Sequence, residues 1–391
     1  MVQFPIIYIS LLYIHFIKIK STTISLPLSK INNLFYLFAT FYDLNDSPLK
    51  ERLYLIDITT QYSLVSIHQT SELPNRTETS LLKNDQHIPV TTINNKLTFN
   101  NNVDILFTYY NIFDPSFMHL SDIRLPFAFN YHDKSFLMTY SFKKQKKINI
   151  AQFTLDPFSN QIYFGDIPNA ILSSLQYKSS FQIDNKFDSW RLEIDAIIVK
   201  ESNKITHIIN AKNNYIEFST TINRFLVPEK IWKNEFYKIV LGKLIRYGIC
   251  YISNRGNLDF IICNEEDKED FPTLGFRMVN DGKIYEIALK DFVSSIGIDK
   301  IRGTQRCEIV FGVNNIFEDN IWVFGAEFMN KVVSVFNYEQ EKVSFYSHSP
   351  YFITNEIDKV DFKYCELYLY VICLCVLIIG IGGILLYMML K

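Results

Sequence analysis

The N-terminal part of this 391-residue chain lacks glycine: residues 1–164 contain none, and all 13 glycines lie at or after Gly165. Because glycine permits tight turns and close approach of backbone segments, any motif that requires a glycine is excluded from the first 164 residues. The chain also lacks a strong net charge, since 39 basic residues stand against 41 acidic ones and leave a formal charge of −2. A chain with this charge balance has no positive electrostatic field that would attract nucleic acid, so we predict no nucleic-acid partner.

Metal-binding patterns are absent as well. The six cysteines have spacings that do not suit zinc, and the seven histidines are scattered without a ligand pattern. We therefore predict no metal and no other cofactor. Neither a short fixed repeat nor a low-complexity linker is present, and with 48% hydrophobic residues the chain can bury a substantial core. The length leaves room for one large or two ordinary domains.

The C-terminal end carries an uncharged run of 24 residues, Leu367–Leu390. At about 1.5 Å per residue, a helix of this length crosses a hydrocarbon core of roughly 30 Å. We predict a transmembrane helix over residues 367–390, preceded by a juxtamembrane linker over residues 353–366. The alternative is a cleaved lipid-anchor signal, which also ends a chain with an apolar tail.

The N-terminal end has an apolar run from Phe4 to Ile17, followed by lysines and small polar residues. This pattern predicts a signal peptide over residues 1–23; because the positive charge that normally precedes the apolar run is missing, an uncleaved anchor is the alternative. Together the two ends predict a single-pass type I membrane protein with its ectodomain in the secretory lumen or outside the cell. There the sequons at Asn45 and Asn75 can be glycosylated.

Three cysteines belong to the predicted ectodomain: Cys250, Cys263 and Cys307. An oxidising compartment favours at least one disulfide among three such residues and leaves one thiol over. Which two residues pair is left open by their spacing alone.

Between the apolar ends, short β-branched and aromatic runs alternate with Asn, Asp, Ser and Pro clusters, as in residues 160–165, 190–199 and 331–345. This alternation predicts a mainly β chain. Long amphipathic periods are few. The best runs from Glu229 to Tyr247, opens after Pro228 and carries apolar residues at helical spacing, so we predict a helix there.

Three segments of the C-terminal half occur in an order and spacing typical of one protein family: Phe271–Phe292, Ile321–Met329 and Val332–Phe345. They resemble, in turn, the Leu-Pro-x-Ile-x-Phe strand and hairpin, the Trp-Ile-Leu-Gly-Asp-x-Phe-Leu-Arg segment and the closing Val-Phe-Asp hairpin of pepsin-family aspartic proteases. In the N-terminal half, Asp122–Phe129 is similar to the family's Asp-Gly-Ile-Leu-Gly-Leu-Ala-Phe.

The resemblance spans roughly residues 34 to 347. It implies an all-β, bilobal fold with a central cleft, in which residues 24–165 form the N-terminal lobe and residues 166–352 the C-terminal lobe. It also implies a disulfide between Cys263 and Cys307, with Cys250 as the remaining thiol. Each lobe of such a fold supplies one catalytic Asp to a cleft that takes a peptide or protein.

Aspartic proteolysis uses two carboxylates about 3 Å apart that share one proton, because two like charges that close cannot both ionise. In the family, each Asp begins an Asp-Thr/Ser-Gly turn: the glycine lets backbones approach closely, and the hydroxyl braces the two turns against each other. Asp57 matches the first catalytic Asp. Ile58 has no hydroxyl for the brace, and Thr59 stands where the family has glycine.

The second catalytic position is set by Pro228, which the family places nine residues after its second Asp. Counting back gives Ser219, followed by Thr220 and Thr221. Serine cannot share a proton as a carboxylic acid does. Glu217 is the first candidate for a replacement carboxylate, although moving it into place would require a two-residue insertion ahead of Pro228.

The family's flap, a hairpin tipped by a Tyr-Gly pair that closes over substrate, has no recognisable counterpart between Asp57 and Asp122, where glycine is absent. Our leading hypothesis is a membrane-anchored, non-catalytic pepsin-like protein that binds an unidentified peptide or protein in its cleft. The first alternative is an active aspartic endopeptidase with a second carboxylate such as Glu217. The second alternative is a surface structural or adhesion protein.

Overall fold

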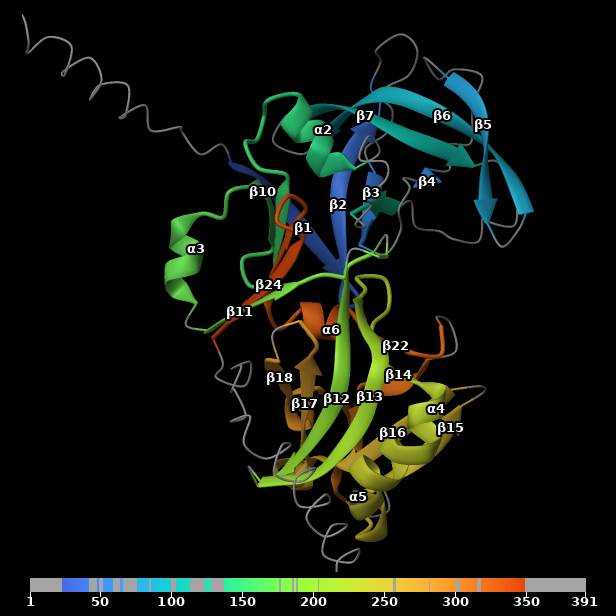
Figure 1. Cartoon of the computed structure of the whole chain (residues 1–391), viewed down its shortest axis with the longest axis vertical. Coiled ribbons are helices and arrows are strands. Elements are labelled where there is room, and N and C mark those ends of the chain that lie inside the picture. The colour runs from blue at the N-terminus through green and yellow to red at the C-terminus, as the bar shows by residue number, and fades with distance from the viewer. Residues whose placement is uncertain are drawn as a thin grey trace, which may run out of the picture.

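Figure 1 shows the computed structural model of the chain. The structure describes residues 23–348, with breaks at 42–47, 49–51, 59–63, 66–75, 84–85, 100–102, 113–123, 128–136, 176, 185, 188, 203, 256–257, 281, 300–302 and 315–317. The predicted transmembrane helix, the linker before it, the sequons at Asn45 and Asn75, and the predicted signal peptide up to residue 22 lie outside the described residues. Within the described part of the chain, no helix is long and apolar enough to cross a membrane.

Strands make up most of the described residues, which confirms the prediction of a mainly β chain. The largest sheet has, among the described residues, thirteen strands in the spatial order β11 (Tyr177–Gln182), β24 (Lys342–Ser347), β23 (Val333–Asn337), β9 (Gln152–Asp156), β10 (Gln161–Gly165), β1 (Thr23–Ile31), β2 (Leu34–Phe41), β3 (Arg52–Asp57), β8 (Arg124–Pro126), β4 (Leu64–Val65), β7 (Val103–Ile112), β6 (Gln86–Phe99) and β5 (Arg76–Lys83).

Two smaller sheets are built entirely from the C-terminal half. One contains, in spatial order, β18 (Ile284–Ala288), β17 (Thr273–Met278), β12 (Arg191–Glu201), β13 (Lys204–Phe218), β22 (Ile321–Phe324), β14 (Phe225–Pro228) and β21 (Phe311–Asn314). The other contains β15 (Cys250–Arg255), β16 (Leu258–Asn264), β20 (Gln305–Ile309) and β19 (Val293–Ile298).

Helices are short. In chain order, those of the described residues are α2 (Met138–Lys144), α3 (Asn169–Ser174), α4 (Glu229–Ile231), the π-helical η3 (Trp232–Leu241), α5 (Gly242–Arg246), the 3₁₀ turns η4 (Glu265–Asp270) and η5 (Leu289–Asp291), and α6 (Ala326–Met329). The predicted helix over residues 229–247 is confirmed as the continuous segment α4, η3 and α5. Its buried face includes Trp232, Phe236 and Val240, which recur every four residues.

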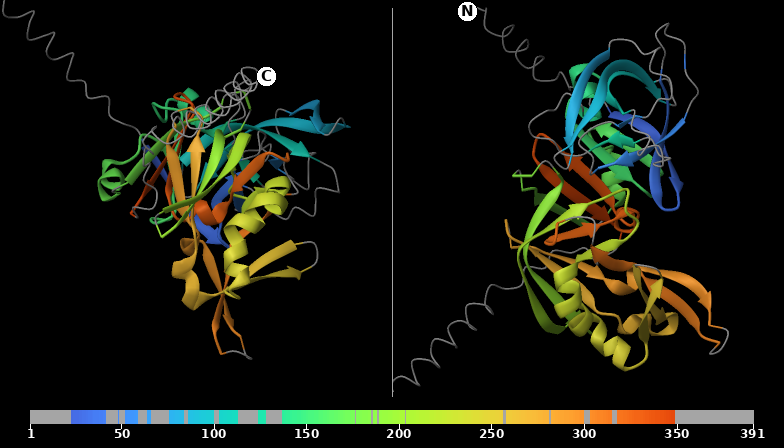
Figure 2. Two further views of the ribbon diagram at one scale, coloured as in Figure 1. Left: turned by 60° about the horizontal axis from the view of Figure 1, so that its bottom comes forward. Right: turned by 90° about the vertical axis from the view of Figure 1, so that its right-hand side faces the viewer.

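The two halves of the chain join through the largest sheet. Strands β11, β24 and β23 come from the C-terminal half, and β23 pairs antiparallel with β9 of the N-terminal half. At this seam the rings of Phe153 and Phe336 stack at 4.7 Å, and Trp190 packs edge-on against Phe336 at 5.0 Å. The N-terminal strands lie at one end of the molecule and the two smaller sheets at the other, with this seam between them (Figures 1 and 2).

Each half repeats the same pairing of four strands. In the N-terminal half β3 is parallel to β8, β8 is antiparallel to β4, and β4 is parallel to β7. In the C-terminal half β13, β22, β14 and β21 pair in the same order and the same directions. The repeat places the end of β3 and the end of β13 at equivalent positions, and these are the strands that lead to Asp57 and Ser219.

The disulfide implied by the family resemblance, between Cys263 and Cys307, is wrong. The bond joins Cys250 to Cys263, and Cys307 is a buried free cysteine. The physical reason lies in the strand order, because β16 runs between β15 and β20, and Cys263 lies directly opposite both Cys250 and Cys307. Sequence spacing cannot distinguish two partners that the sheet places on either side of one residue.

Candidate functional site

Asp57 is the last residue of β3 and is fully buried. Its carbonyl oxygen accepts a hydrogen bond of 2.7 Å from the amide of Phe127. The carbonyl of Phe127 in turn accepts hydrogen bonds from the Trp190 indole, at 2.8 Å, and from the Tyr338 hydroxyl, at 3.0 Å. Side chains of the C-terminal half thereby fix the backbone next to Asp57.

Ser219 directly follows β13 and is also fully buried. Its amide donates to the carbonyl of Phe324 at 3.0 Å. Its hydroxyl oxygen accepts hydrogen bonds of 3.3 Å from the amides of Thr221 and Ile222 and lies 3.2 Å from the Thr221 hydroxyl. The Ser219 side chain therefore stabilises its own turn, in the manner of serine side chains that cap local backbone amides.

Thr220 joins the two turns. Its hydroxyl donates to the carbonyl of Ile56 at 2.5 Å and accepts from the amide of Ile58 at 3.3 Å, across 164 and 162 residues of sequence. These two contacts flank Asp57 on both sides, so the structure brings the Asp57 turn and the Ser219 turn together. Ile58 has no hydroxyl to return the contact, and the brace is made from one side only.

Gly325 provides the close approach that the second turn needs. A Cβ atom at this position would lie 2.2 Å from the carbonyl oxygen of Ile222 and 2.3 Å from that of Arg224. The amide of Ala326 donates to the same Ile222 oxygen at 2.6 Å. The equivalent position in the N-terminal half is Pro126, which lies opposite Asp57 in the β3 and β8 pairing. A proline ring does not permit the approach that Gly325 permits.

Glu217, the candidate replacement carboxylate, lies two residues before Ser219 on β13 and is buried. Its Oε2 accepts a hydrogen bond of 2.6 Å from Nε of Arg191, the residue opposite it on β12. Burial raises the pKa of Glu217 above its ordinary value, Arg191 opposes this rise, and the charges of Glu318 and Asp57 add to it. Glu217 is thus within electrostatic range of Asp57, and its carboxylate is bound to an arginine.

Arg191 is held at the edge of this site by further contacts. Its guanidinium lies 4.7 Å from the centre of the Phe187 ring and 3.7 Å from the exposed carboxylate of Glu318. The Phe187 ring packs edge-on against Tyr215, two residues before Glu217 on β13. An ion pair and two aromatic rings therefore lie beside the part of β13 that leads to Ser219.

Sequence reasoning missed two contributors to this site. Thr220 stands one residue after the second catalytic position, where the family's pattern has a hydroxyl, and that pattern could have identified it as the brace. The pairing of Arg191 with Glu217 depends on the register of β12 and β13, for which the sequence has no signal. A hairpin was also missed: β5 and β6 pair antiparallel in the interval where no counterpart of the flap was expected, although no Tyr-Gly pair lies at its turn.

Many solved structures share this architecture, among them the following two. Basic 7S globulin from soybean is 12% identical, with a TM-score of 0.60 over 86% of this chain and 100% of that chain. The aspartic proteinase from Irpex lacteus is 10% identical, with a TM-score of 0.61 over 84% of this chain and 98% of that chain. No protein-family model matches the chain, and curated protein sequences give no match. At such low identity the two likenesses establish a pepsin-like fold and no activity.

Proposed function

We propose that this chain is a non-catalytic, membrane-anchored pepsin-like protein that binds an extended peptide or protein segment between its two lobes. The observation that carries the proposal is the hydrogen bonding of Ser219, the residue at the second family position. This residue replaces the second catalytic carboxylate, and its buried hydroxyl oxygen accepts the amides of Thr221 and Ile222. A hydroxyl in that position stabilises a turn but cannot share a proton with Asp57.

Hydrolysis by this fold requires an acid and a base on opposite sides of one water molecule. Of the two family positions, only Asp57 carries a carboxylate. The nearest further candidate, Glu217, accepts a hydrogen bond from Arg191 at 2.6 Å. This charge-assisted hydrogen bond occupies the carboxylate that would have to share a proton with Asp57.

Binding, by contrast, needs only the relative placement of the lobes, and the elements that set this placement are retained. The seam of β9 and β23 joins the two halves in one sheet, Thr220 bridges the two turns, and Gly325 packs under the second turn. An extended peptide can then pair through its backbone groups, which is a mode of recognition that needs no catalytic residue.

Membrane anchoring is the second part of the proposal. The 24-residue uncharged run at 367–390 and the apolar N-terminal run support a type I topology with the pepsin-like region in the lumen or outside the cell. Protease digestion of sealed microsomes tests it: we expect the pepsin-like region to be protected until detergent is added. Digestion in intact vesicles would contradict this orientation.

An active endopeptidase is the alternative, and one observation favours it. Asp57 contributes to the raised pKa of Glu217, so the two carboxyl groups interact electrostatically. If Arg191 were displaced by substrate, the two could form an acid and base pair. This alternative predicts that activity would be lost in Glu217→Gln as well as in Asp57→Ala.

A cleavage assay on the purified full-length chain separates the two readings. We expect no hydrolysis of a peptide library at any pH between about 3 and 7, a range that covers the working pH of carboxylate pairs. A pepsin-like enzyme under the same conditions is the positive control, and Asp57→Ala should leave the result unchanged. Pepstatin-sensitive cleavage by the wild-type chain that disappears in Asp57→Ala would overturn the proposal.

A further inference from the structure

Three cysteines lie in a row across three neighbouring strands of the four-stranded sheet. Cys263 on β16 is directly opposite Cys250 on β15 and directly opposite Cys307 on β20. Residues that face each other across antiparallel strands point to the same side of the sheet, so the three sulfur atoms share one face. All three side chains are buried. The central cysteine therefore has a sulfur neighbour on each side, and one of them is already bonded to it.

We propose that Cys263 exchanges between two disulfide partners, so that the chain interconverts by an intramolecular step between a Cys250–Cys263 form and a Cys263–Cys307 form. In this step the thiolate of Cys307 attacks Sγ of Cys263, a bond forms between these two sulfurs, and the bond to Cys250 breaks. Cys250 leaves as a thiolate and takes up the proton that Cys307 gave up. One disulfide is consumed and one is formed, so no external oxidant or reductant is needed.

The sheet provides the geometry for both forms. The Cα atoms of Cys250 and Cys263 are 4.0 Å apart, slightly closer than is usual in disulfides. Directly opposed residues of antiparallel strands have Cα atoms roughly 4.5 to 5.5 Å apart, which overlaps the range of about 4.4 to 6.8 Å found in disulfides. Because Cys263 is on the middle strand, the attacking sulfur of Cys307 and the leaving sulfur of Cys250 lie on opposite sides of it, as an in-line displacement requires. The second bond can therefore form without a change in strand order.

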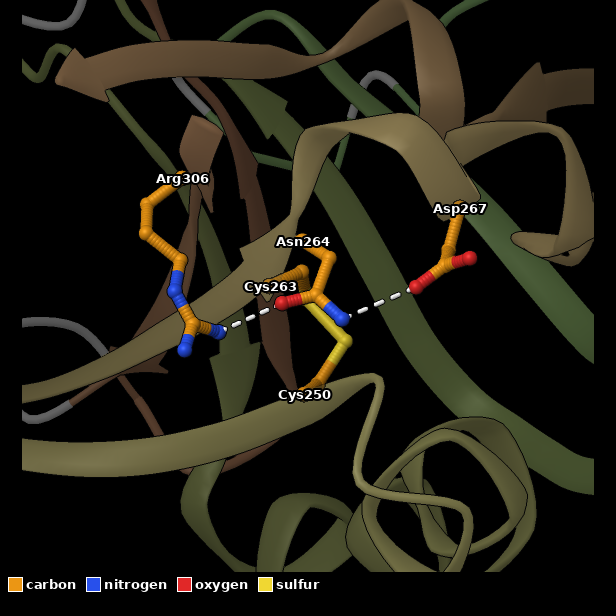
Figure 3. The surroundings of a disulfide bond; sticks show 5 residues. All are labelled: Cys250, Cys263, Asn264, Asp267 and Arg306. Atoms are coloured by element: carbon orange, nitrogen blue, oxygen red, sulfur yellow. Dashed lines mark hydrogen bonds between the residues drawn. A yellow bond between two sulfur atoms is a disulfide. The ribbon is translucent and has the colours of Figure 1, made fainter. Parts of the chain in front are cut away.

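The exchange would alter how one edge strand is attached. β15 is the outermost strand of the sheet, and it follows directly on α5. The neighbouring strands β16 and β20 have a separate connection, in which Nη1 of Arg306 donates to Asn264 at 2.6 Å and Asn264 donates to Asp267 at 2.9 Å (Figure 3). Moving the disulfide to Cys307 removes the covalent link between β15 and β16 and leaves only their backbone pairing to hold β15.

The strand that carries Cys250 is connected, through a helical segment, to the strand that follows the candidate site. The helical segment of residues 229–246 connects β14, six residues after Ser219, to β15. Its Phe236 ring packs on Phe311 at 5.6 Å, and Phe311 pairs with Phe225 at the start of β14. The Cys250–Cys263 bond thus fixes the strand at the far end of the segment that follows β14, and exchange removes this covalent link.

The surroundings of Cys307 make the step slow at neutral pH. The pKa of the Cys307 thiol is raised to about 11, chiefly by burial and also by Glu265 of η4, against the opposing effects of Lys268 of η4 and the adjacent Arg306. The residue that faces Cys307 on β19 is the neutral Ser295. Since the thiolate is the attacking species, the rate should rise about tenfold for each unit by which the pH is raised, up to that pKa.

Mass-spectrometric mapping of the full-length chain tests the proposal, because trypsin separates the three cysteines into peptides 247–255, 256–268 and 307–331. The chain is purified without reductant, incubated at about pH 6 or pH 9, acidified, and its free thiols are alkylated before digestion. At pH 6 we expect the 247–255 peptide linked to 256–268. At pH 9 we expect 256–268 linked to 307–331 to appear, with alkylated Cys250.

Two variants distinguish the intramolecular step from other reactions. Cys307→Ser should show no change of linkage at pH 9; loss of its Cys250–Cys263 bond at the wild-type rate would mean attack by another thiol, such as Cys365 or a thiol of a second molecule, and would overturn the proposal. Cys250→Ser should form the Cys263–Cys307 bond. A wild-type chain that holds only the Cys250–Cys263 bond at both pH values would also overturn it, and this outcome does not depend on the folding of any variant.

Discussion

The two turns at the candidate site lack complementary features. The turn of the N-terminal half has its carboxylate, Asp57, but Ile58 supplies no hydroxyl and Pro126 takes the position of the close-packing glycine. The turn of the C-terminal half has its hydroxyl, Thr220, and its glycine, Gly325, but it has Ser219 where the family's pattern has a carboxylate. The C-terminal turn therefore supplies the contacts between the two turns, whereas the N-terminal turn supplies the one carboxylate, Asp57. The difference teaches that the fold needs a single brace, whereas the chemistry needs two carboxylates.

The largest expected effect comes from Gly325→Ala. Its Cβ would meet two backbone carbonyl oxygens at 2.2 and 2.3 Å, and neither atom can move aside without shifting the second turn. We expect a loss of at least about 3 kcal/mol in the free energy of unfolding, or no folded protein. Urea denaturation measures the loss. Gly312→Ala is the matched control, because its added Cβ meets nothing closer than 3.5 Å and should cost less than about 1 kcal/mol. Equal losses in the two variants would contradict the asymmetry.

Thr220→Val should have the next largest effect. The change removes the hydroxyl that contacts the Ile56 carbonyl and the Ile58 amide and leaves its volume nearly unchanged. We expect a loss of roughly 1 to 3 kcal/mol, the cost of leaving buried polar groups without partners. Thr221→Val removes a hydroxyl from the same turn without breaking a bond between lobes, and it should cost less. If Thr221→Val costs as much as Thr220→Val, the brace does not join the turns as we infer.

A smaller effect should appear in the pH dependence of stability. Because burial raises the pKa of Glu217 above 4.5, the folded chain binds more protons than the unfolded chain between pH 4.5 and the raised pKa. Stability contributed by this group therefore rises as pH falls through that window and is lost as pH rises. The difference in unfolding free energy between wild type and Glu217→Gln should follow this slope. Asp57→Asn should lower the upper end of this window, and an unmoved upper end would contradict an interaction between the two carboxyl groups.

The smallest expected effect, no change at all, concerns Ser219→Asp. The new carboxylate restores one family residue to the C-terminal turn, but the Asp57 turn still lacks the hydroxyl at Ile58 and the glycine at Thr59. Catalytic groups held without their supporting residues are misplaced by enough to abolish activity. We expect no peptide cleavage between about pH 3 and 7. Pepstatin-sensitive cleavage by this variant would show that the Asp57 turn is competent as it stands.

The sequence by itself determined the local structure, because strand and helix patterns depend on neighbouring residues. It predicted strands that the structure has at β10, β12 and β23, and it predicted the helical segment that begins after Pro228. The resemblance to a family pointed to Asp57 and Ser219 as the two turn positions, and the turns that hold them meet through Thr220. The topology of the chain ends and the catalytic status of these two residues stay predictions.

Only the tertiary structure decided which residues meet across the fold. It joined Thr220 to Ile56 and Ile58, Arg191 to Glu217, and Cys250 rather than Cys307 to Cys263. Each of these contacts is set by the register of paired strands or by the meeting of two lobes. A shift of one residue in register turns a side chain to the other face of a sheet, so contacts of this kind leave no trace in the spacing of the sequence.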